Sequence, residues 1–426
     1  MTVRIEKPAF NLRDKISQLD LPVGLHGSQL LRSQTAEETF RLARAGRRRL
    51  NVNGDMKVCQ RATTTTGQTV ANFHGPDMAI NYFASVGTWT VSQDAYDVPP
   101  TGEFTHSVKY QCTSAATSLG VNSYLYLIQR IEAVDSWQVQ FGTTYATPVS
   151  ASFWVKSNKT GSVQVNLENE NNNGPSGGDM VCCRRVRVNS PNTWEYKTVT
   201  FPGDTNIKFD FTTHKGLVLD IGFTAGTNYN DGDFAGDGKW LEIGNTKRFA
   251  GCDTNWADST SNYINITGIQ IEIGETSTPY EHRPYGEELA LCMRRCQILG
   301  SQYKLGPGAY APAQSEYNCI GRGWTRSTGA VQTMSFLPVP FLKMPTAAVY
   351  SFDNVASPTN EFYLQYNGNS TQHDCVFTGM NSQGSNLHSI WLDWDPVTDA
   401  SSVTPCHIGS KHSAAERNGI ILTAEI

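Results

Sequence analysis

Charge is scarce in this sequence. Lys, Arg, Asp and Glu together make up 17% of the 426 residues, and the formal net charge is −5. Nucleic-acid binding generally needs clustered Lys and Arg that displace counterions from phosphates, so the composition argues against a nucleic-acid partner. The single basic run is Arg-Arg-Arg at 47–49. We interpret it as a solvated helix end that complements the helix dipole, with a contact to nucleic acid or an acidic protein as the alternative.

Long apolar runs are absent as well. No segment reaches the ~18 apolar residues that a helix needs to span a bilayer. The first residues carry charges at Arg4, Glu6 and Lys7 and do not show the apolar core of a signal peptide. We therefore expect no membrane insertion, and synthesis and folding in a reducing cytosol.

The ten cysteines do not have the spacing of a small disulfide framework. Cys292 and Cys296 are one helical turn apart, but two such residues alone make an incomplete zinc site. Free thiols buried in the core are the expected outcome, because unpaired cysteine behaves as a small apolar residue.

Motifs for catalysis are also missing. The sequence has no nucleophile elbow, phosphate loop or paired-histidine zinc motif, so we expect a protein that is not an enzyme. The best candidate metal site is the Gly-rich loop with Asp231, Asp233 and Asp237, whose carboxylates are hard oxygen ligands of the kind calcium prefers. The loop lacks the glutamate of an EF-hand, and solvated turn residues are the competing interpretation. We expect no cofactor, with calcium as the alternative.

The residues that are abundant are typical of a mainly β protein. The sequence has 37 glycines and 10% aromatic residues, a mix that suits short strands joined by many turns. Apolar and polar residues alternate along 163–167, 217–223 and 269–273. Alternation with a period of two indicates strands with one buried and one solvated face, as in paired antiparallel sheets. We predict a jelly-roll-like β-sandwich over residues 47–285.

Residues 1–46 differ from the rest of the chain. Thr35-Ala36-Glu37-Glu38 has the pattern of a capping box, and Gly46 is placed to end the helix that follows it. Two short helices with little apolar area do not fold alone, so this segment is expected to attach the chain to another copy or to a different protein. The apolar residues assigned to that attachment are Leu12, Ile16, Leu19, Leu30, Leu31, Phe40 and Leu42.

Two further parts follow the predicted sandwich. Residues 286–300 are expected to form a short linker helix, with an apolar stripe made of Leu289, Cys292, Met293, Cys296 and Leu299. Residues 301–426 are expected to form a second, smaller β-sandwich, with strands at 362–366 and 420–426. Pro338 and Pro340 exclude a central strand at 336–341, because proline lacks the ladder donor.

Four stretches of the sequence, in this order, resemble phage tail-fibre and related virion appendage proteins. They read RRLNVNGDMKVCQR at 48–61, SFWVKS at 152–157, WEYKTVTFPGDT at 194–205 and TPYEHRPYGEELALC at 278–292. The last is similar to the family's ATPFEHRPYGEELALC pattern. The resemblance implies a β-domain like a carbohydrate-binding module and an N-terminal segment that attaches to other virion proteins. Closed cyclic symmetry is usual in fibres, so a homotrimer is expected.

The aromatic residues supply the candidate binding site. Aromatic rings stack on sugars while polar neighbours bond to the hydroxyls. We assign Trp154 and Trp194 to the core because they lie in alternating strands. The glycan-binding candidates, chosen for their aromatic or polar character and their polar neighbours, are Trp256, Trp240, Tyr229, Asp231, Trp391 and Trp394. The competing interpretation is that these indoles cover the edges of the core.

The sequence therefore predicts a phage virion protein, a tail fibre that binds a host-surface polysaccharide through its β-domains. One alternative is a capsid decoration, head-fibre or tail adaptor protein without a receptor role. Another is a spike that degrades polysaccharide, with acidic residues at Asp393, Asp395 and Asp399 near two tryptophans. The expected location is the virion, at the tail or the particle surface.

Overall fold

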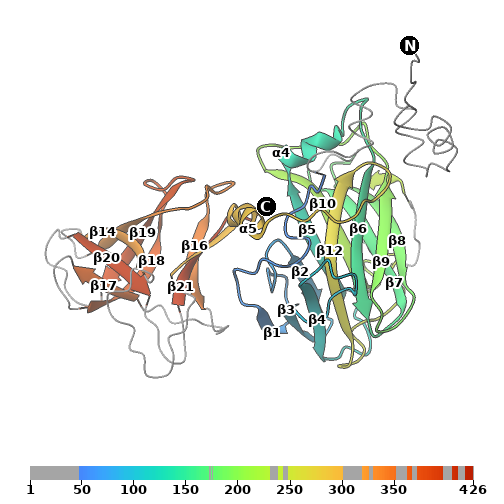
Figure 1. Ribbon diagram of the computed structural model, residues 1–426, viewed down its shortest axis with the longest axis horizontal. Helices are drawn as coiled ribbons and strands as arrows, with labels where there is room; N and C mark the ends of the chain where they lie inside the picture. Colours follow the sequence, from blue (N-terminus) through green and yellow to red (C-terminus); the bar gives the residue numbers. More distant parts are fainter. Residues whose placement is uncertain are drawn as a thin grey trace, which may run out of the picture. The chain divides into compact units, whose positions relative to one another are not determined.

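The computed structural model describes residues 48–171, 174, 176–230, 238–242, 248–300, 319–325, 330–351, 362–366, 372–396, 405–410 and 418–425. The chain divides into two compact units, Met1–Arg48 and Arg49–Ile426, and the second contains every element below (Figure 1). The predicted attachment segment, with Leu12, Ile16, Leu19, Leu30, Leu31, Phe40 and Leu42, lies outside the described residues. So do Asp231, Asp233 and Asp237 of the candidate calcium loop.

The prediction of a mainly β protein with a jelly-roll-like sandwich is confirmed. Sheet A contains six strands in the order β1 (Thr64–Gln68), β3 (Thr88–Asp94), β4 (Ser107–Ser114), β12 (Tyr263–Ile273), β6 (Val149–Ser157) and β9 (Glu195–Phe201). Sheet B contains β11 (Trp240–Glu242), β8 (Met180–Val188), β7 (Gly161–Asn169), β10 (Lys215–Ala225), β5 (Tyr124–Glu132) and β2 (Ile80–Ala84). Strands that are distant in sequence become neighbours, as β12 does between β4 and β6.

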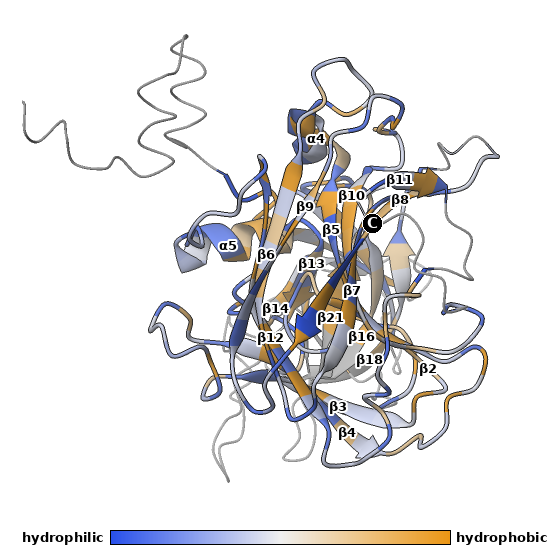
Figure 2. Ribbon diagram, turned by 90° about the vertical axis from the view of Figure 1, so that its right-hand side faces the viewer, coloured by the Kyte–Doolittle hydropathy of each residue, from blue (hydrophilic) through white to orange (hydrophobic). Residues whose placement is uncertain are grey.

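The core of the sandwich follows from the alternation along its strands. Apolar residues of β7 and β10 enter one hydrophobic cluster together with those of β6 and β12 (Figure 2). In β12, Ile264 and Ile266 are buried in this cluster, and so are Ile269 and Ile271. The spacing changes by one residue because the ladder between β12 and β6 shifts register between Thr267 and Gln270. Such a bulge keeps the apolar residues on both sides of it on the same face.

The short helices differ partly from expectation. Helix α4 (Ala133–Ser136) and the 3-10 turn η1 (Trp137–Val139) follow β5. Helix α5 (Tyr285–Met293) corresponds to the predicted linker helix but ends earlier than residue 300. Residues Cys296–Leu299 instead form strand β13, which pairs with β21 (Asn418–Thr423). The apolar spacing of 296–299 fits a helix or a strand, and the distant partner strand decides between them.

The C-terminal part is also β, but its larger sheet closes on itself. Strands β14 (Cys319–Thr325), β15 (Val331–Phe336), β19 (Ser389–Pro396), β18 (Gln372–Asn381), β17 (Phe362–Tyr366) and β20 (Pro405–Ser410) form a closed barrel. A three-stranded sheet has the order β13, β21 and β16 (Thr346–Ser351). The expected second sandwich is therefore corrected to a barrel and a small sheet. Closure occurs because β14 pairs with β15 on one side and with β20 on the other.

Several local predictions for this part are confirmed. The stretch 362–366 is strand β17, and β15 ends at Phe336, before the first of the two prolines. Most of the predicted strand at 420–426 belongs to β21, which lies in the middle of its sheet between β13 and β16. No helix among the described residues has the length and apolar character of a membrane span.

Candidate functional site

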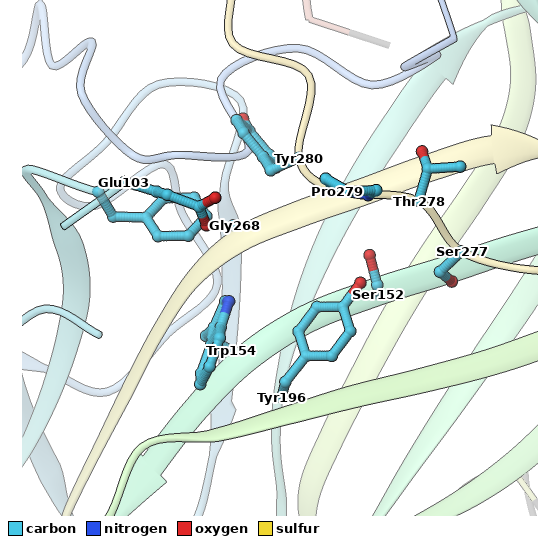
Figure 3. Close-up of a pocket in the computed structure, with 10 residues that line it drawn as sticks. Glu103, Ser152, Trp154, Tyr196, Gly268, Ser277, Thr278, Pro279 and Tyr280 are labelled. Carbon is cyan, nitrogen blue, oxygen red and sulfur yellow. The ribbon is translucent and has the colours of Figure 1, made fainter. Parts of the chain in front are cut away.

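A pocket of about 390 Å³ lies on the outer face of sheet A, opposite the core (Figure 3). Strands β6 and β9 and the bulge of β12 form its floor. Its walls come from the loop between β3 and β4 and from the segment that follows β12. Its volume falls within the range usual for small-molecule sites. The pocket thus depends on five parts of the chain that are distant in sequence.

Two aromatic side chains make up the floor. Trp154 of β6 is paired directly with Tyr196 of β9, and their ring centroids are 5.3 Å apart with an interplanar angle of 47° (Figure 3). Both point outward, because the neighbouring Phe153 and Val155 belong to the core. Tyr196 is 43% exposed. Since each ring comes from a paired strand, the floor is held by the backbone ladder.

Gly268 allows the wall to approach this floor. Its φ of +64° lies in the left-handed region that favours glycine. A Cβ atom at this position would stand 2.7 Å from Cζ of Phe104 and 3.2 Å from Cδ1 of Trp154. Phe104 comes from the loop between β3 and β4 and is almost fully buried. The glycine therefore serves the bulge and the close packing of both aromatic rings.

The segment after β12 forms the opposite wall. Thr278 donates two hydrogen bonds to Glu272, from its amide to Oε1 at 2.6 Å and from its hydroxyl to Oε2 at 2.7 Å. Tyr280 packs edge-on against Phe104, with ring centroids 5.1 Å apart. Pro279 lies between these two anchors and also lines the pocket. This wall is the beginning of the TPYEHRPYGEELALC stretch.

Polar groups surround the aromatic floor. The Ser152 side chain lies beside the hydroxyl end of Tyr196 (Figure 3). The Oγ atom of Ser277 is buried and has no hydrogen-bond partner. Glu103 is exposed at the rim. Burial raises the pKa of Tyr196, and nearby Glu272 and Glu103 act in the same direction while Ser152 opposes them, so the phenol stays neutral at pH 7.

This combination has a defined chemical capacity. Flat aromatic faces accept the apolar side of a ring-shaped ligand, and hydroxyls and a carboxylate beside them exchange hydrogen bonds with polar substituents. The unpartnered Ser277 Oγ is a donor or acceptor that a ligand would satisfy. No candidate nucleophile or acid–base pair with a reaction geometry is apparent among the described residues that line the pocket.

Two of the glycan-binding candidates are in the core, which corrects the prediction. Trp256 is 0% exposed, belongs to the core of the sandwich and donates its indole N–H to Ser157 Oγ at 2.8 Å. Trp394 is 1% exposed in the core of the C-terminal part and donates to Thr333 Oγ1 at 2.9 Å. Polar neighbours in sequence suggested a solvent-facing indole, but a single internal hydrogen bond satisfies each ring.

Three other candidates, Trp240, Tyr229 and Trp391, are partly buried and lie outside the pocket. The Trp240 indole donates to the Pro202 carbonyl at 2.7 Å, and Tyr229 packs edge-on against Tyr124, with centroids 5.2 Å apart. Trp391 lies on the outer side of the barrel against Trp324, with ring centroids 5.3 Å apart, and Trp324 is 45% exposed. Asp231 lies outside the described residues.

The assignment of Trp154 and Trp194 to the core is wrong. Trp154 lines the pocket, and the Trp194 indole is only partly buried and donates to Asp97 Oδ1 at 3.0 Å. The signal for Trp154 was present in SFWVKS: if Phe153 and Val155 face the core, alternation turns Trp154 outward. The segment 277–280 carried no comparable signal, because its contact with sheet A depends on tertiary structure.

A second polar cluster lies on the outer face of sheet B but is closed. Arg248 Nη2 lies 2.5 Å from Glu168 Oε2 and 3.0 Å from Asp220 Oδ2, and both acids are fully buried. Gln164 donates to the Arg248 carbonyl and accepts from Gly251 N–H, so this segment is held against the sheet. The cluster is a structural network rather than a ligand site.

The basic run and the cysteines are also placed by the structure. Arg49 is buried rather than solvated, which corrects the interpretation of residues 47–49 as an exposed helix end. Cys292 and Cys296 are buried free thiols, as expected. Within the described residues, no group of three or more His, Cys, Asp or Glu is placed to hold a metal ion.

Comparison with known proteins gives only remote similarities. No family model matches the chain, and no curated relative was found. A tailspike protein 4 domain of bacteriophage CBA120 aligns at 11% identity over 53% of this chain and 21% of its own, with a TM-score of 0.26. The CBM22-2 xylan-binding domain of Paenibacillus barcinonensis aligns at 10% identity over 52% of this chain and 97% of its own, with a TM-score of 0.25. A family 11 carbohydrate-binding module of Clostridium thermocellum aligns at 11% identity over 50% and 99%, with a TM-score of 0.24.

Proposed function

We propose that the sandwich binds a glycan through the pocket on sheet A, and that the chain is an appendage protein of a phage virion. The observation that carries the binding proposal is the aromatic floor of Trp154 and Tyr196 beside the unpartnered hydroxyl of Ser277. One sugar ring lies on the two aromatic faces, and its hydroxyls bond to the polar groups at the wall and rim.

The virion role is supported by the four stretches that resemble tail-fibre and appendage proteins. The floor of the pocket comes from two of them, since Trp154 lies in SFWVKS and Tyr196 in WEYKTVTFPGDT. The wall at 278–280 begins a third. The resemblance therefore concerns the residues that build the site. In this proposal residues 1–46 attach a homotrimer to the particle, and the β-domains contact the bacterial surface.

A single shallow sugar site binds weakly, and the proposed assembly compensates through copy number. Linked sites on one particle convert later binding events into intramolecular ones, which raises the overall affinity without any new contact. We propose that the protein binds the polysaccharide and does not cleave it. Incubation with host capsule or lipopolysaccharide tests this point, because release of reducing ends would favour a degrading spike.

The binding proposal is tested by glycan-array binding of the purified protein and of Trp154→Ala and Tyr196→Ala. Each variant is expected to lose at least about 80% of the retained signal, since stacking contributes about 1 kcal/mol or more per ring, about fivefold in affinity. Trp137→Ala is the matched control, because this indole is 50% exposed and does not line the pocket. Equal binding by all four proteins would remove the pocket from the proposal.

The virion proposal is tested separately by imaging labelled particles. Label at the tail supports a fibre, whereas label on the head supports the capsid decoration or head-fibre alternative. Deletion of residues 1–46 is expected to abolish incorporation and to leave a soluble β-domain that still binds glycan. Particles that retain the truncated chain would contradict the attachment role of this segment.

A further inference from the structure

The geometry points to a sugar residue without an acidic group as the ligand of the sheet A pocket. This inference rests on the proposed glycan binding and adds the class of sugar. It follows from the charges of the residues that line the pocket, which favour neutral and amino sugars over uronic acids and other anionic residues.

The side chains that line the pocket supply a negative charge and no cation. Glu103 is the one acidic residue among the described residues that line it, and these include no lysine or arginine. Its carboxylate lies at the exposed rim, where it accepts hydrogen bonds from sugar hydroxyls. Bonds to a charged acceptor are stronger than bonds between neutral groups. An anionic substituent at the same place meets repulsion instead.

Glu272 adds to this negative field from beneath the wall. Its side chain is 1% exposed and accepts both hydrogen bonds from Thr278. The effect reaches the floor, because both Glu272 and Glu103 act on the hydroxyl of Tyr196. The negative charges of two carboxylates therefore act on the space that a sugar would occupy.

The nearby cations are engaged elsewhere. Arg49 lies 4.8 Å above the Tyr280 ring but forms its ion pair with Glu288, away from the pocket. Lys156 is 2.9 Å from Asp97, and Lys197 is 2.5 Å from Glu195. An acidic sugar would thus enter the pocket without a cation to pair with its charge. A neutral sugar ring needs no such partner.

Ser277 provides a neutral hydrogen-bonding group on the wall. Its buried Oγ has no partner, and a hydroxyl both donates and accepts. A sugar hydroxyl or an acetamido group satisfies it equally well. The polar recognition that this pocket offers therefore suits uncharged substituents.

The test uses matched pairs of immobilised glycans that end in glucose or glucuronic acid, and in galactose or galacturonic acid. The wild-type protein is expected to bind each neutral member about fivefold or more tightly than its acidic counterpart, the size of a single charge contact at about 4 Å in water. The ratio is expected to shrink at about 1 M salt, where the Debye length is about 3 Å.

Glu103→Gln identifies the source of the discrimination. This variant is expected to bind the acidic glycans more tightly and to lose most of the dependence of the ratio on salt. Asp135→Asn is the matched control, because it removes an exposed carboxylate from helix α4, outside the pocket, and it is expected to keep the wild-type ratio.

The outcomes separate this inference from the proposed function. Equal binding of neutral and acidic members, or a ratio that Glu103→Gln leaves unchanged, would overturn the inference while glycan binding stands. Failure of the folded wild-type protein to retain any glycan of a broad array would overturn the proposed function, and the inference with it.

Discussion

Arg49 and Glu288 form an ion pair in which both side chains are fully buried. They are 239 positions apart in sequence, in the first and last of the four stretches that resemble appendage proteins. Arg283 lies 3.6 Å from the same carboxylate and donates a hydrogen bond to the carbonyl of Asn51 at 3.1 Å. The two stretches are thus one structural unit, which closes the sandwich beside the pocket wall.

Removal of one partner of this pair is expected to destabilise the protein strongly. Glu288→Gln leaves the Arg49 guanidinium buried without its counter-charge, and we expect a loss of about 3 to 5 kcal/mol in the free energy of unfolding. Denaturant unfolding followed by tryptophan fluorescence measures it. Glu287→Gln on the same helix is the control, with an expected change below about 1 kcal/mol. Similar losses in both variants would contradict a special role for the pair.

Gly268→Ala is expected to damage the fold and the pocket together. The new Cβ meets Phe104 and Trp154 at a left-handed backbone position, and we expect a loss of about 1 to 3 kcal/mol. Thermal unfolding and glycan binding are measured on the same sample. Gly286→Ala is the matched control, since no atom lies within 4 Å of the added Cβ and the residue is in helix α5. That substitution is expected to be neutral or stabilising.

Substitution of Trp256 is expected to lower stability, whereas substitution of Trp154 is expected to lower glycan binding. Trp256→Ala removes a fully buried indole, so we expect a loss of about 3 to 5 kcal/mol in the free energy of unfolding. Trp154→Ala truncates a ring on the outer face and is expected to cost about 1 kcal/mol of stability while removing most of the glycan retention. Retained binding by Trp154→Ala together with a large loss of stability would show that this indole is structural.

Glu168 in β7 and Glu170 just after this strand are expected to give stability opposite dependences on pH. Burial raises the pKa of Glu168 well above its ordinary value, with Asp220 acting in the same direction and Arg248 only partly opposing them. A carboxyl group with a raised folded-state pKa contributes stability below its unfolded pKa, and the contribution is lost as pH rises through the folded value. Relative to Glu168→Gln, the wild-type protein is therefore expected to lose stability as pH rises above about 4.5.

Glu170 supplies the comparison. Burial alone would raise its pKa, but Arg130 and its hydrogen bonds outweigh burial, and the pKa is lowered. This contribution is present above the unfolded pKa and is lost as pH falls through the folded value. Unfolding of wild type, Glu168→Gln and Glu170→Gln between about pH 4 and pH 8 measures both effects. Differences from wild type that change in the same direction with pH would contradict this account.

The periodic strands were predictable, and the reason is local. Alternation along 163–167, 217–223 and 269–273 identified β7, β10 and part of β12, and Pro338 marked the region after β15. The burial of Trp256 was not predictable, because its sequence neighbours are polar and its burial depends on contacts with distant segments of the chain, such as Ser157 and Thr224. The bulge at Gly268 was not predictable either, because the need for glycine there depends on Phe104, which packs against it from a distant part of the sequence.

The barrel and the pocket wall required long-range information. The sequence of residues 319–325 does not indicate that their strand pairs with both 331–336 and 405–410. That double pairing is what makes the sheet a closed barrel and not one layer of a sandwich. Likewise, the position of Ser277 depends on Glu272 and Gln270 holding the chain against β12. Sequence patterns specify faces of strands, whereas these features depend on which strands become neighbours.

The pocket divides its residues between two kinds of support. Trp154 and Tyr196 belong to paired strands, whereas Glu103 and Ser277 belong to connecting segments. Connecting segments tolerate substitution far better than central strands do. For the proposed glycan site, substitutions at positions 103 and 277 are therefore a route to a changed choice of sugar that preserves the stacking platform and the stability of the domain.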